Sequence, residues 1–167
     1  SGRGGGKKGG GQRNPGGKPE MIRAVIDTHV FVSPLLTPGS NASAILDWVR
    51  ADRVGLLVSR GILAEIERVL QDPKLAGRHR MSLGRIREFL NAYAEIAQMT
   101  EERTAVRRVQ GDPAGDRYLA CAVEGWADFI ISGDHRLTDL KTYRGIRIVT
   151  SGDFVELQAN IIQIDNL

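Results

Sequence analysis

Four acidic side chains, far apart along the chain, have the chemical type and the placement needed to hold a divalent cation. They are Asp27, Asp116, Asp134 and either Glu65 or Glu67. Asp27 directly follows a short apolar run, Asp134 follows another after Ser132 and Gly133, and the others lie on or beside the apolar faces of expected helices. Oxygen ligands alone suit Mg²⁺ or Mn²⁺ rather than zinc. Two such ions can activate a water and stabilise the leaving oxygen in phosphodiester hydrolysis, so neither a covalent nucleophile nor a histidine is required.

The stretch from Asp112 to Asp134 contains the most informative of these placements. Asp112 and Pro113 predict a helix start, with Asp112 as the cap rather than a ligand. Apolar residues then recur at helical spacing with Asp116 on the same face, and Gly125 predicts the helix end. Because an acid on an apolar helix face is costly unless a cation meets it, a ligand role is favoured for Asp116.

The other acids also have ordinary structural explanations. Asp27 could cap the turn after its strand, and the Ser-Gly-Asp sequence ending at Asp134 recurs at residues 151–153, where it predicts a helix cap. Glu65 and Glu67 lie on opposite shoulders of one apolar stripe. Helical periodicity alone therefore leaves both glutamates open as ligands.

Hydrophobic periodicity predicts strands that alternate with helices. Strands are expected at residues 21–27, 55–59, 105–109, 129–131 and 147–150. Helices are expected after caps at Ser40 or Asn41, Ser59, Ser82, Asp112 and residues 151–153, with a turn at 28–31 and a basic loop at 74–80. This alternation predicts a parallel sheet of about five strands in a three-layer α/β/α arrangement. Such sheets place their sites beyond the carboxyl ends of the strands, where the four acids are expected to meet.

Composition places the chain among ordinary globular proteins. It has 167 residues, 41% of them hydrophobic, and no apolar run approaches the roughly 20 residues that span a bilayer. A single cysteine, Cys121, cannot form an internal disulfide, which fits a reducing cytoplasm. Residues 1–20 carry five of the 23 basic and one of the 20 acidic side chains, so 18 basic and 19 acidic ones remain. The net charge of +3 therefore gives no evidence of a nucleic-acid partner, and any such surface must be a local patch.

Three segments are expected. Residues 1–20 are rich in Gly, Lys and Arg, which predicts a disordered leader, either a nucleic-acid-binding arm or an added or mistaken upstream sequence. The second interpretation is favoured because Met21 makes a natural start. Residues 21–158 are expected to form the domain, and residues 159–167 a tail.

Four motifs, in this order, resemble a known family. They are Val25-Ile26-Asp27-Thr28; Ser59 with Ile62-Leu63-Ala64-Glu65 and Arg68-Val69-Leu70; Asp116-Arg117-Tyr118-Leu119-Ala120; and Ala127-Asp128-Phe129-Ile130-Ile131-Ser132-Gly133-Asp134. Together they make residues 21–157 similar to a PIN domain, the metal-dependent ribonuclease fold of VapC-type toxins. The resemblance implies a PIN-like α/β/α sandwich and an endoribonuclease that acts with Mg²⁺ or Mn²⁺.

The resemblance also assigns roles to individual residues. It implies that Asp27, Glu65, Asp116 and Asp134 are the catalytic, metal-binding acids, and so it chooses Glu65 over Glu67. It further implies that Thr28 and Ser132 support the site through their hydroxyl groups. RNA as substrate, a homodimer and a small antitoxin protein whose tail occupies the site are implied partners.

Two departures from the family pattern stand out. Family members usually have Asn after the Asp-Thr pair, where this chain has His29, although a histidine still offers a hydrogen bond to the site. A further acid often precedes the position of Asp116, where this chain has Gly115. His29 favours a rival interpretation, a catalytically weak nucleic-acid-binding or scaffold PIN domain. A phosphatase of the haloacid dehalogenase type would need Asp-x-Asp after the first strand, and His29 breaks that pattern.

Candidate contacts to the RNA backbone are basic residues near the expected site. They are Arg78, Arg80, Arg117 and Arg136. Most surface arginines are simply solvated, so this set is a prediction that rests on position alone.

Overall fold

The central strand, β1 (Ile22–Ile26), leads directly into the first candidate acid. It lies inside a six-stranded sheet with the order β3-β2-β1-β4-β6-β5, seen in the computed structural model, which describes residues 21–106 and 113–165. The other strands are β2 (Val54–Ser59), β3 (Gln98–Thr100), β4 (Phe129–Ile131), β5 (Thr142–Tyr143) and β6 (Ile146–Val149). Three residues of β1, beginning with Ala24, are buried, as expected for a strand covered on both faces.

Parallel pairing brings the carboxyl ends of the main strands to one edge. β1 pairs in parallel with β2 and β4, with Val25 opposite both Leu57 and Ile130. The ladder continues past β1, because the backbone N–H of Asp27 donates to the carbonyl of Ile131 at 3.0 Å. β5 alone among the described strands runs antiparallel, beside β6. The residues that follow β1, β2 and β4 therefore lie near one another.

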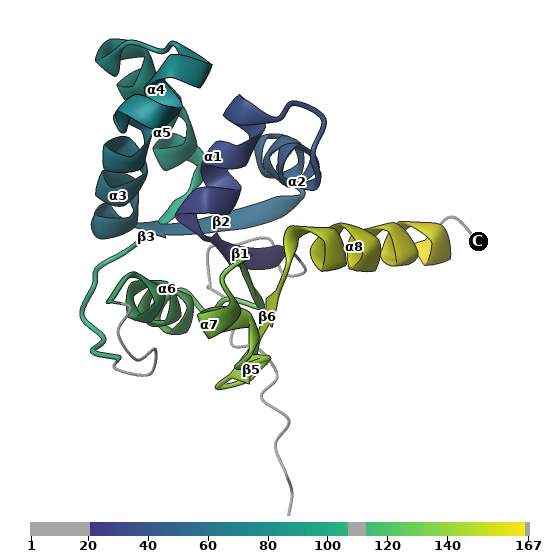
Figure 1. Ribbon diagram of the computed structural model, residues 1–167. Coiled ribbons are helices and arrows are strands. Elements are labelled where there is room, and N and C mark those ends of the chain that lie inside the picture. The colour runs from purple at the N-terminus through teal and green to yellow at the C-terminus, as the bar shows by residue number, and fades with distance from the viewer. Residues whose placement is uncertain (1–20, 107–112, 166–167) are drawn as a thin grey trace, which may run out of the picture.

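Helices cover both faces of this sheet (Figure 1). They are α1 (Thr28–Leu36), α2 (Asn41–Arg50), α3 (Arg60–Leu70), α4 (Pro73–His79), α5 (Leu83–Ile96), α6 (Pro113–Glu124), α7 (His135–Thr138) and α8 (Ser151–Asp165). Figure 1 shows α1 to α5 on one side of the sheet and α6 on the other, with α7 near β6. The three-layer α/β/α arrangement expected from the alternation of elements is confirmed.

Local sequence signals explain several of the helix ends. Ser59 caps α3 by accepting a hydrogen bond from the backbone N–H of Ile62 at 3.2 Å, and Ser82 caps α5 in the same way. Gly125 follows the last residue of α6, and a methyl group there would lie 2.7 Å from Cδ1 of Leu57. Gly125 therefore permits a close approach of α6 to the sheet, and the predicted helix end is confirmed.

Three expectations about secondary structure were wrong. Residues 28–31 belong to α1 and not to a turn, and most of the expected basic loop at 74–80 is the short helix α4, which Asp72 caps. The strand expected at residues 105–109 lies earlier, at β3, where Thr100 is opposite Ser59. Residues 105–106 are in no strand, and residues 107–109 lie outside the described part of the chain.

Smaller differences concern the edges of elements. The sheet has six described strands instead of about five, because β5 adds a two-residue edge strand. Ser40, rather than Asn41, caps α2, and the Thr150 hydroxyl accepts from the backbone of Asp153 at the start of α8. α8 continues past residue 158 to Asp165. The predicted cap Asp112 lies outside the described residues.

Within the described residues, no helix is long and apolar enough to cross a bilayer.

Candidate functional site

Asp27 is the best-anchored acid at the carboxyl edge of the sheet. It is 3% exposed and caps α1, because its Oδ1 accepts from the backbone N–H groups of His29 at 2.7 Å and Val30 at 3.3 Å. A buried carboxylate is costly without such partners, and the helix N-terminus favours negative charge. The sequence forms this cap because β1 ends at Asp27 and α1 begins at the next residue.

Ser132 connects Asp27 to the second acid of the edge, Asp134. Its buried hydroxyl donates to Oδ2 of Asp27 and accepts from the backbone N–H of Asp134 at 3.0 Å. β4 ends at Ile131, so this serine is the first residue past the strand next to β1. The structure thus gives Ser132 the hydroxyl contact expected of a supporting residue.

Asp134 caps the short helix α7 and forms an ion pair. Its Oδ1 accepts from the backbone N–H of Arg136 at 2.9 Å, and the Arg136 guanidinium lies 3.2 Å from Oδ1 and 3.0 Å from Oδ2. Both carboxylate oxygens of this half-buried acid are therefore in contact with one arginine. Bidentate pairs of this kind are the stronger form of charge-assisted hydrogen bond.

Glu65 belongs to a separate hydroxyl network that begins at the residue after Asp27. Its Oε2 lies 2.8 Å from the Tyr118 hydroxyl and 3.0 Å from the Thr28 hydroxyl, and it accepts from both groups. The Tyr118 oxygen also accepts from the backbone N–H of Thr28 at 3.0 Å. Because Thr28 directly follows Asp27, this network and the Asp27–Ser132–Asp134 chain are continuous along the backbone.

Burial raises the pKa of Tyr118 well above the ordinary tyrosine value, and its hydrogen bonds with Thr28 offset part of this effect. Tyr118 therefore remains a neutral phenol at physiological pH, with a proton to donate. A hydroxyl that donates to Glu65 and accepts from Thr28 uses both of its capacities. Sequence reasoning missed Tyr118 as a site residue, although its position two residues after Asp116 was a usable signal.

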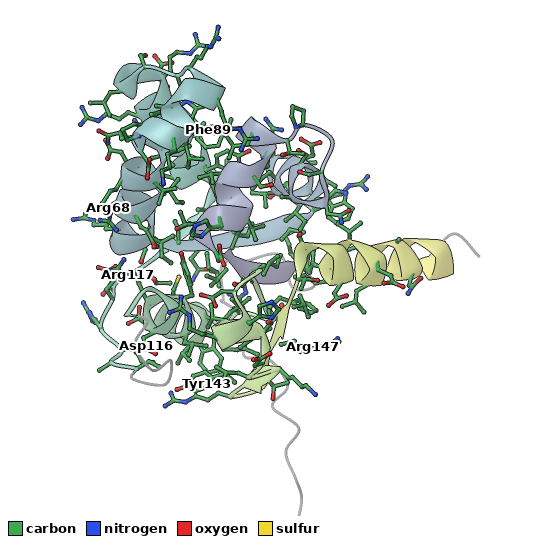
Figure 2. The ribbon with its side chains drawn as sticks, viewed as in Figure 1. Arg68, Phe89, Asp116, Arg117, Tyr143 and Arg147 are labelled. Atoms are coloured by element: carbon green, nitrogen blue, oxygen red, sulfur yellow. The ribbon has the colours of Figure 1, made fainter. Side chains whose placement is uncertain are left out.

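Asp116 stands apart from the other three acids in how it is placed. It lies in the first turn of α6 and is half-buried rather than fully inward-facing. Figure 2 shows Asp116 and Arg117 at the end of α6 that approaches α3. In the two described ranges, no group of three or more His, Cys, Asp or Glu side chains is placed to hold a metal ion. The four acids predicted to meet at one edge and hold one or two cations therefore do not form a preformed cluster within those ranges.

The donor chemistry nevertheless fits a hard divalent cation. The side chains along this edge offer carboxylate and hydroxyl oxygens, and the imidazole of His29 is 84% exposed with Nδ1 4.0 Å from Oδ1 of Asp27. Mg²⁺ is usually held by one or two carboxylates together with waters and substrate phosphates. Asp27 and Asp134, joined through Ser132, are a suitable pair for such a site.

A pocket of about 380 Å³ opens beside these two acids. Its lining includes Asp27, Asp134, His29 and Ser33 from α1, and Ala42 from α2. This volume is within the range of small-molecule sites, roughly 300–1,000 Å³. The pocket therefore offers room for a small ligand next to the carboxylates.

The four candidate arginines differ in their surroundings. Arg78 and Arg80 are exposed at the end of α4, and Arg78 contacts the carbonyl of Leu36 at 3.4 Å. Arg117 is half-buried and contacts the carbonyl of Gly61 at 3.5 Å. Arg136 is engaged with Asp134, as described above. A role in RNA binding stays a prediction for all four.

Comparison with known proteins places this arrangement in a family. The sequence model of the PIN domain family matches residues 23–136, which include β1 through the start of α7. An uncharacterized protein of Methanocaldococcus jannaschii is 32% identical over 123 residues, which cover 72% of this chain and 76% of that protein. The residues that the family model matches include Asp27, Glu65, Asp116 and Asp134.

Proposed function

The chain belongs to the PIN domain family, and from this premise we propose that it is a metal-dependent endoribonuclease that hydrolyses RNA phosphodiesters. PIN domains are generally nucleases. The observation that best supports the proposal is the connection of Asp27 to Asp134 through Ser132, with both acids in the lining of one pocket. Each of these carboxylates also caps a helix, and a divalent cation would offset the cost of bringing the two negative charges to one edge of the sheet.

Asp27, Glu65, Asp116 and Asp134 are the proposed ligands of one or two Mg²⁺ or Mn²⁺ ions. Such ions supply Lewis acidity and neutralise charge on a phosphodiester. Ser132 and Thr28 keep two of the carboxylates oriented. Arg136 contacts both oxygens of Asp134, so Asp134 becomes a ligand when this ion pair opens, and the released guanidinium can then contact a phosphate.

The test is cleavage of an end-labelled, mixed-sequence RNA pool by the purified full chain with Mn²⁺, with Mg²⁺ and with EDTA. We expect cutting that requires the metal and that falls at least roughly a hundredfold in Asp116→Asn, because one anionic ligand is lost. Asp153→Asn, an exposed acid in the first turn of α8, is the matched control and should cut normally. Full activity in Asp116→Asn would remove this residue from the mechanism.

A second candidate function is a nucleic-acid-binding or scaffold domain with weak catalysis. Two observations favour it: the exposed His29 stands at the mouth of the pocket, and Asp134 is paired with Arg136. This function predicts RNA binding that survives EDTA, with no turnover in either metal. His29→Asn separates the two functions, because restored cutting in this variant would identify the histidine as the cause of weak activity.

The finer proposal is a toxin of a toxin–antitoxin pair, acting as a homodimer and inhibited by a small antitoxin. It is supported by the resemblance to VapC-type toxins, and the pocket beside Asp27 offers a place for an antitoxin tail. Co-expression with the product of a small neighbouring reading frame should suppress RNA cleavage and yield a stable complex. Free, fully active nuclease after such co-expression would contradict the antitoxin proposal.

Replacing Ser33, which lines the pocket, tests whether the pocket takes part in substrate binding. A Ser33→Phe variant places an aromatic ring at the pocket lining, and we expect KM for RNA to rise roughly tenfold because about 1.4 kcal/mol of binding is lost. Thr37→Phe, at the exposed carboxyl end of the same helix, is the control and should leave KM unchanged. Equal KM values in both variants would place the substrate elsewhere.

A further inference from the structure

We propose that Tyr118 is a positioning residue of the cation site, whose hydroxyl holds the Glu65 carboxylate against Thr28 so that one oxygen of Glu65 stays available to a cation. This inference rests on the proposed function, because it gives Tyr118 a task in metal binding. Tyr118 does not itself touch the substrate or the cation in this scheme.

The Tyr118 hydroxyl joins three helices at the carboxyl edge of the sheet. Tyr118 is 4% exposed on α6, whereas Thr28 begins α1 and Glu65 lies in α3. Figure 1 shows α6 on one side of the sheet and both α1 and α3 on the other. The distances of 2.8 Å to Glu65 Oε2, 2.8 Å to Thr28 Oγ1 and 3.0 Å from the Thr28 backbone nitrogen therefore connect the two helical layers.

Glu65 needs such help more than Asp27 does. Asp27 is fixed by two backbone N–H groups and by Ser132, while Glu65 lies on a half-buried helix face with a longer side chain. Ordering a glutamate side chain costs roughly 1.5–2 kcal/mol of rotamer entropy. Among the described residues, the hydrogen bonds to Glu65 all go to Oε2, which leaves Oε1 for a ligand role.

The competing explanation is that Tyr118 only fills space and satisfies the Thr28 backbone. Under that explanation, loss of the hydroxyl lowers stability but leaves metal affinity unchanged. A positioning role predicts that loss of the hydroxyl weakens metal binding, because removing a group that orients a metal ligand typically lowers metal affinity by roughly 10–100-fold. The two explanations therefore differ in a measurable quantity that does not depend on catalysis.

The experiment measures Mn²⁺ binding to the full-length protein without RNA, by electron paramagnetic resonance titration. Tyr118→Phe keeps the buried ring and should weaken Mn²⁺ binding roughly tenfold or more. Tyr93→Phe is the matched control: Tyr93 is 3% exposed on α5, with its ring centroid 4.9 Å from that of Phe31. This control should bind Mn²⁺ within about twofold of the unmodified chain, and thermal unfolding should show both variants folded.

A second comparison places the effect at Glu65. In a Glu65→Gln background, Tyr118→Phe should weaken Mn²⁺ binding by less than about twofold further, because the group it positions no longer carries a charge. Equal Mn²⁺ affinity of Tyr118→Phe and the unmodified chain, or an undiminished effect in the Glu65→Gln background, overturns the inference.

The same titrations keep the two proposals distinguishable. If the unmodified chain binds Mn²⁺ and cuts RNA while Tyr118→Phe binds Mn²⁺ equally well, the inference about Tyr118 is wrong and the nuclease proposal is retained. Mn²⁺ binding that weakens in Tyr118→Phe without any RNA cleavage supports the inference and removes the nuclease. No Mn²⁺ binding by the unmodified chain removes both.

Discussion

Replacing Asp27 with Asn should reduce kcat/KM for RNA by roughly a thousandfold or more, while the protein stays folded. Asp27 is the most buried of the proposed ligands, and it is held by the backbone of α1 and by Ser132. A thousandfold loss corresponds to about 4 kcal/mol of transition-state stabilisation, the scale of charge stabilisation by a bound metal. Kinetics of cleavage with Mn²⁺ at saturating metal would measure it.

Asparagine is the informative replacement because it separates the charge from the cap. Asn and Asp are about equally good helix caps, so Asp27→Asn should retain the start of α1. Asp47→Asn is the control, since Asp47 is 65% exposed on α2 and pairs with Arg50 at the surface. Exposed pairs contribute about 0–1 kcal/mol to stability, so this variant should cut RNA normally. Unchanged cleavage by Asp27→Asn would mean that Asp27 serves only as a cap.

The second large effect is expected from Glu65→Gln, with Glu67→Gln as an internal control on the same helix. We expect a loss of roughly a hundredfold in kcat/KM for Glu65→Gln, because a neutral amide is a much weaker ligand for Mg²⁺ or Mn²⁺. Glutamine keeps an oxygen that accepts from Tyr118 and Thr28, so the local fold should persist. Glu67 instead pairs with Arg87 at 2.9 Å, and its replacement should change activity by less than about twofold.

This pair of variants also decides between the two glutamates that helical periodicity left open. A loss in Glu67→Gln that equals or exceeds the loss in Glu65→Gln would move the site to the other shoulder of α3. Circular dichroism spectra at the assay temperature, together with the melting temperature of each variant, provide the check that both remain folded. Equal, unaltered activity in both would remove α3 from the site altogether.

The main strands and most of the long helices were predictable because they carry strong local signals. β4 is a continuous apolar run and β1 ends in the apolar residues Ala24 to Ile26, with Ser132 and Asp27 directly after them, which placed the edge of the sheet correctly. The capping residues Ser59 and Ser82 predicted the starts of α3 and α5. These signals act within one or two turns of chain, which is why sequence alone contained them.

Elements whose position depends on tertiary contacts were not predictable in the same way. α1 lacks helical periodicity and contains Pro34, yet it is fixed by its cap and by the aromatic contacts of Phe31. β3 begins one residue after the α5 cap and contains Gln98 and Thr100, so no apolar run marks it and its position depends on its pairing with β2. Short helix α4 has no buried residues, so no apolar stripe marks it, and its start depends on the Asp72 cap and on Pro73 at the first helical position.

The candidate site was predictable in composition and less so in geometry. Strand ends placed Asp27 and Asp134 at one edge, as parallel topology requires. The Tyr118 hydrogen bonds depend on side-chain directions across three different elements, and the Arg136 ion pair depends on the rotamer of a side chain within α7; no spacing rule expresses either. Asp116 was expected to face inward from its apolar neighbours, whereas α6 buries Tyr118 more deeply than Asp116.

The most direct test of the central claim is the anomalous diffraction of a crystal of this protein soaked in Mn²⁺. The account predicts a peak roughly 2.0–2.2 Å from carboxylate oxygens of Asp27 and Asp134, with Glu65 or Asp116 completing the site directly or through water. The Arg136 guanidinium should have moved away from Asp134 in that structure. A peak at a different acidic cluster, or an Asp27–Asp134 edge without a peak at saturating Mn²⁺, would contradict the account.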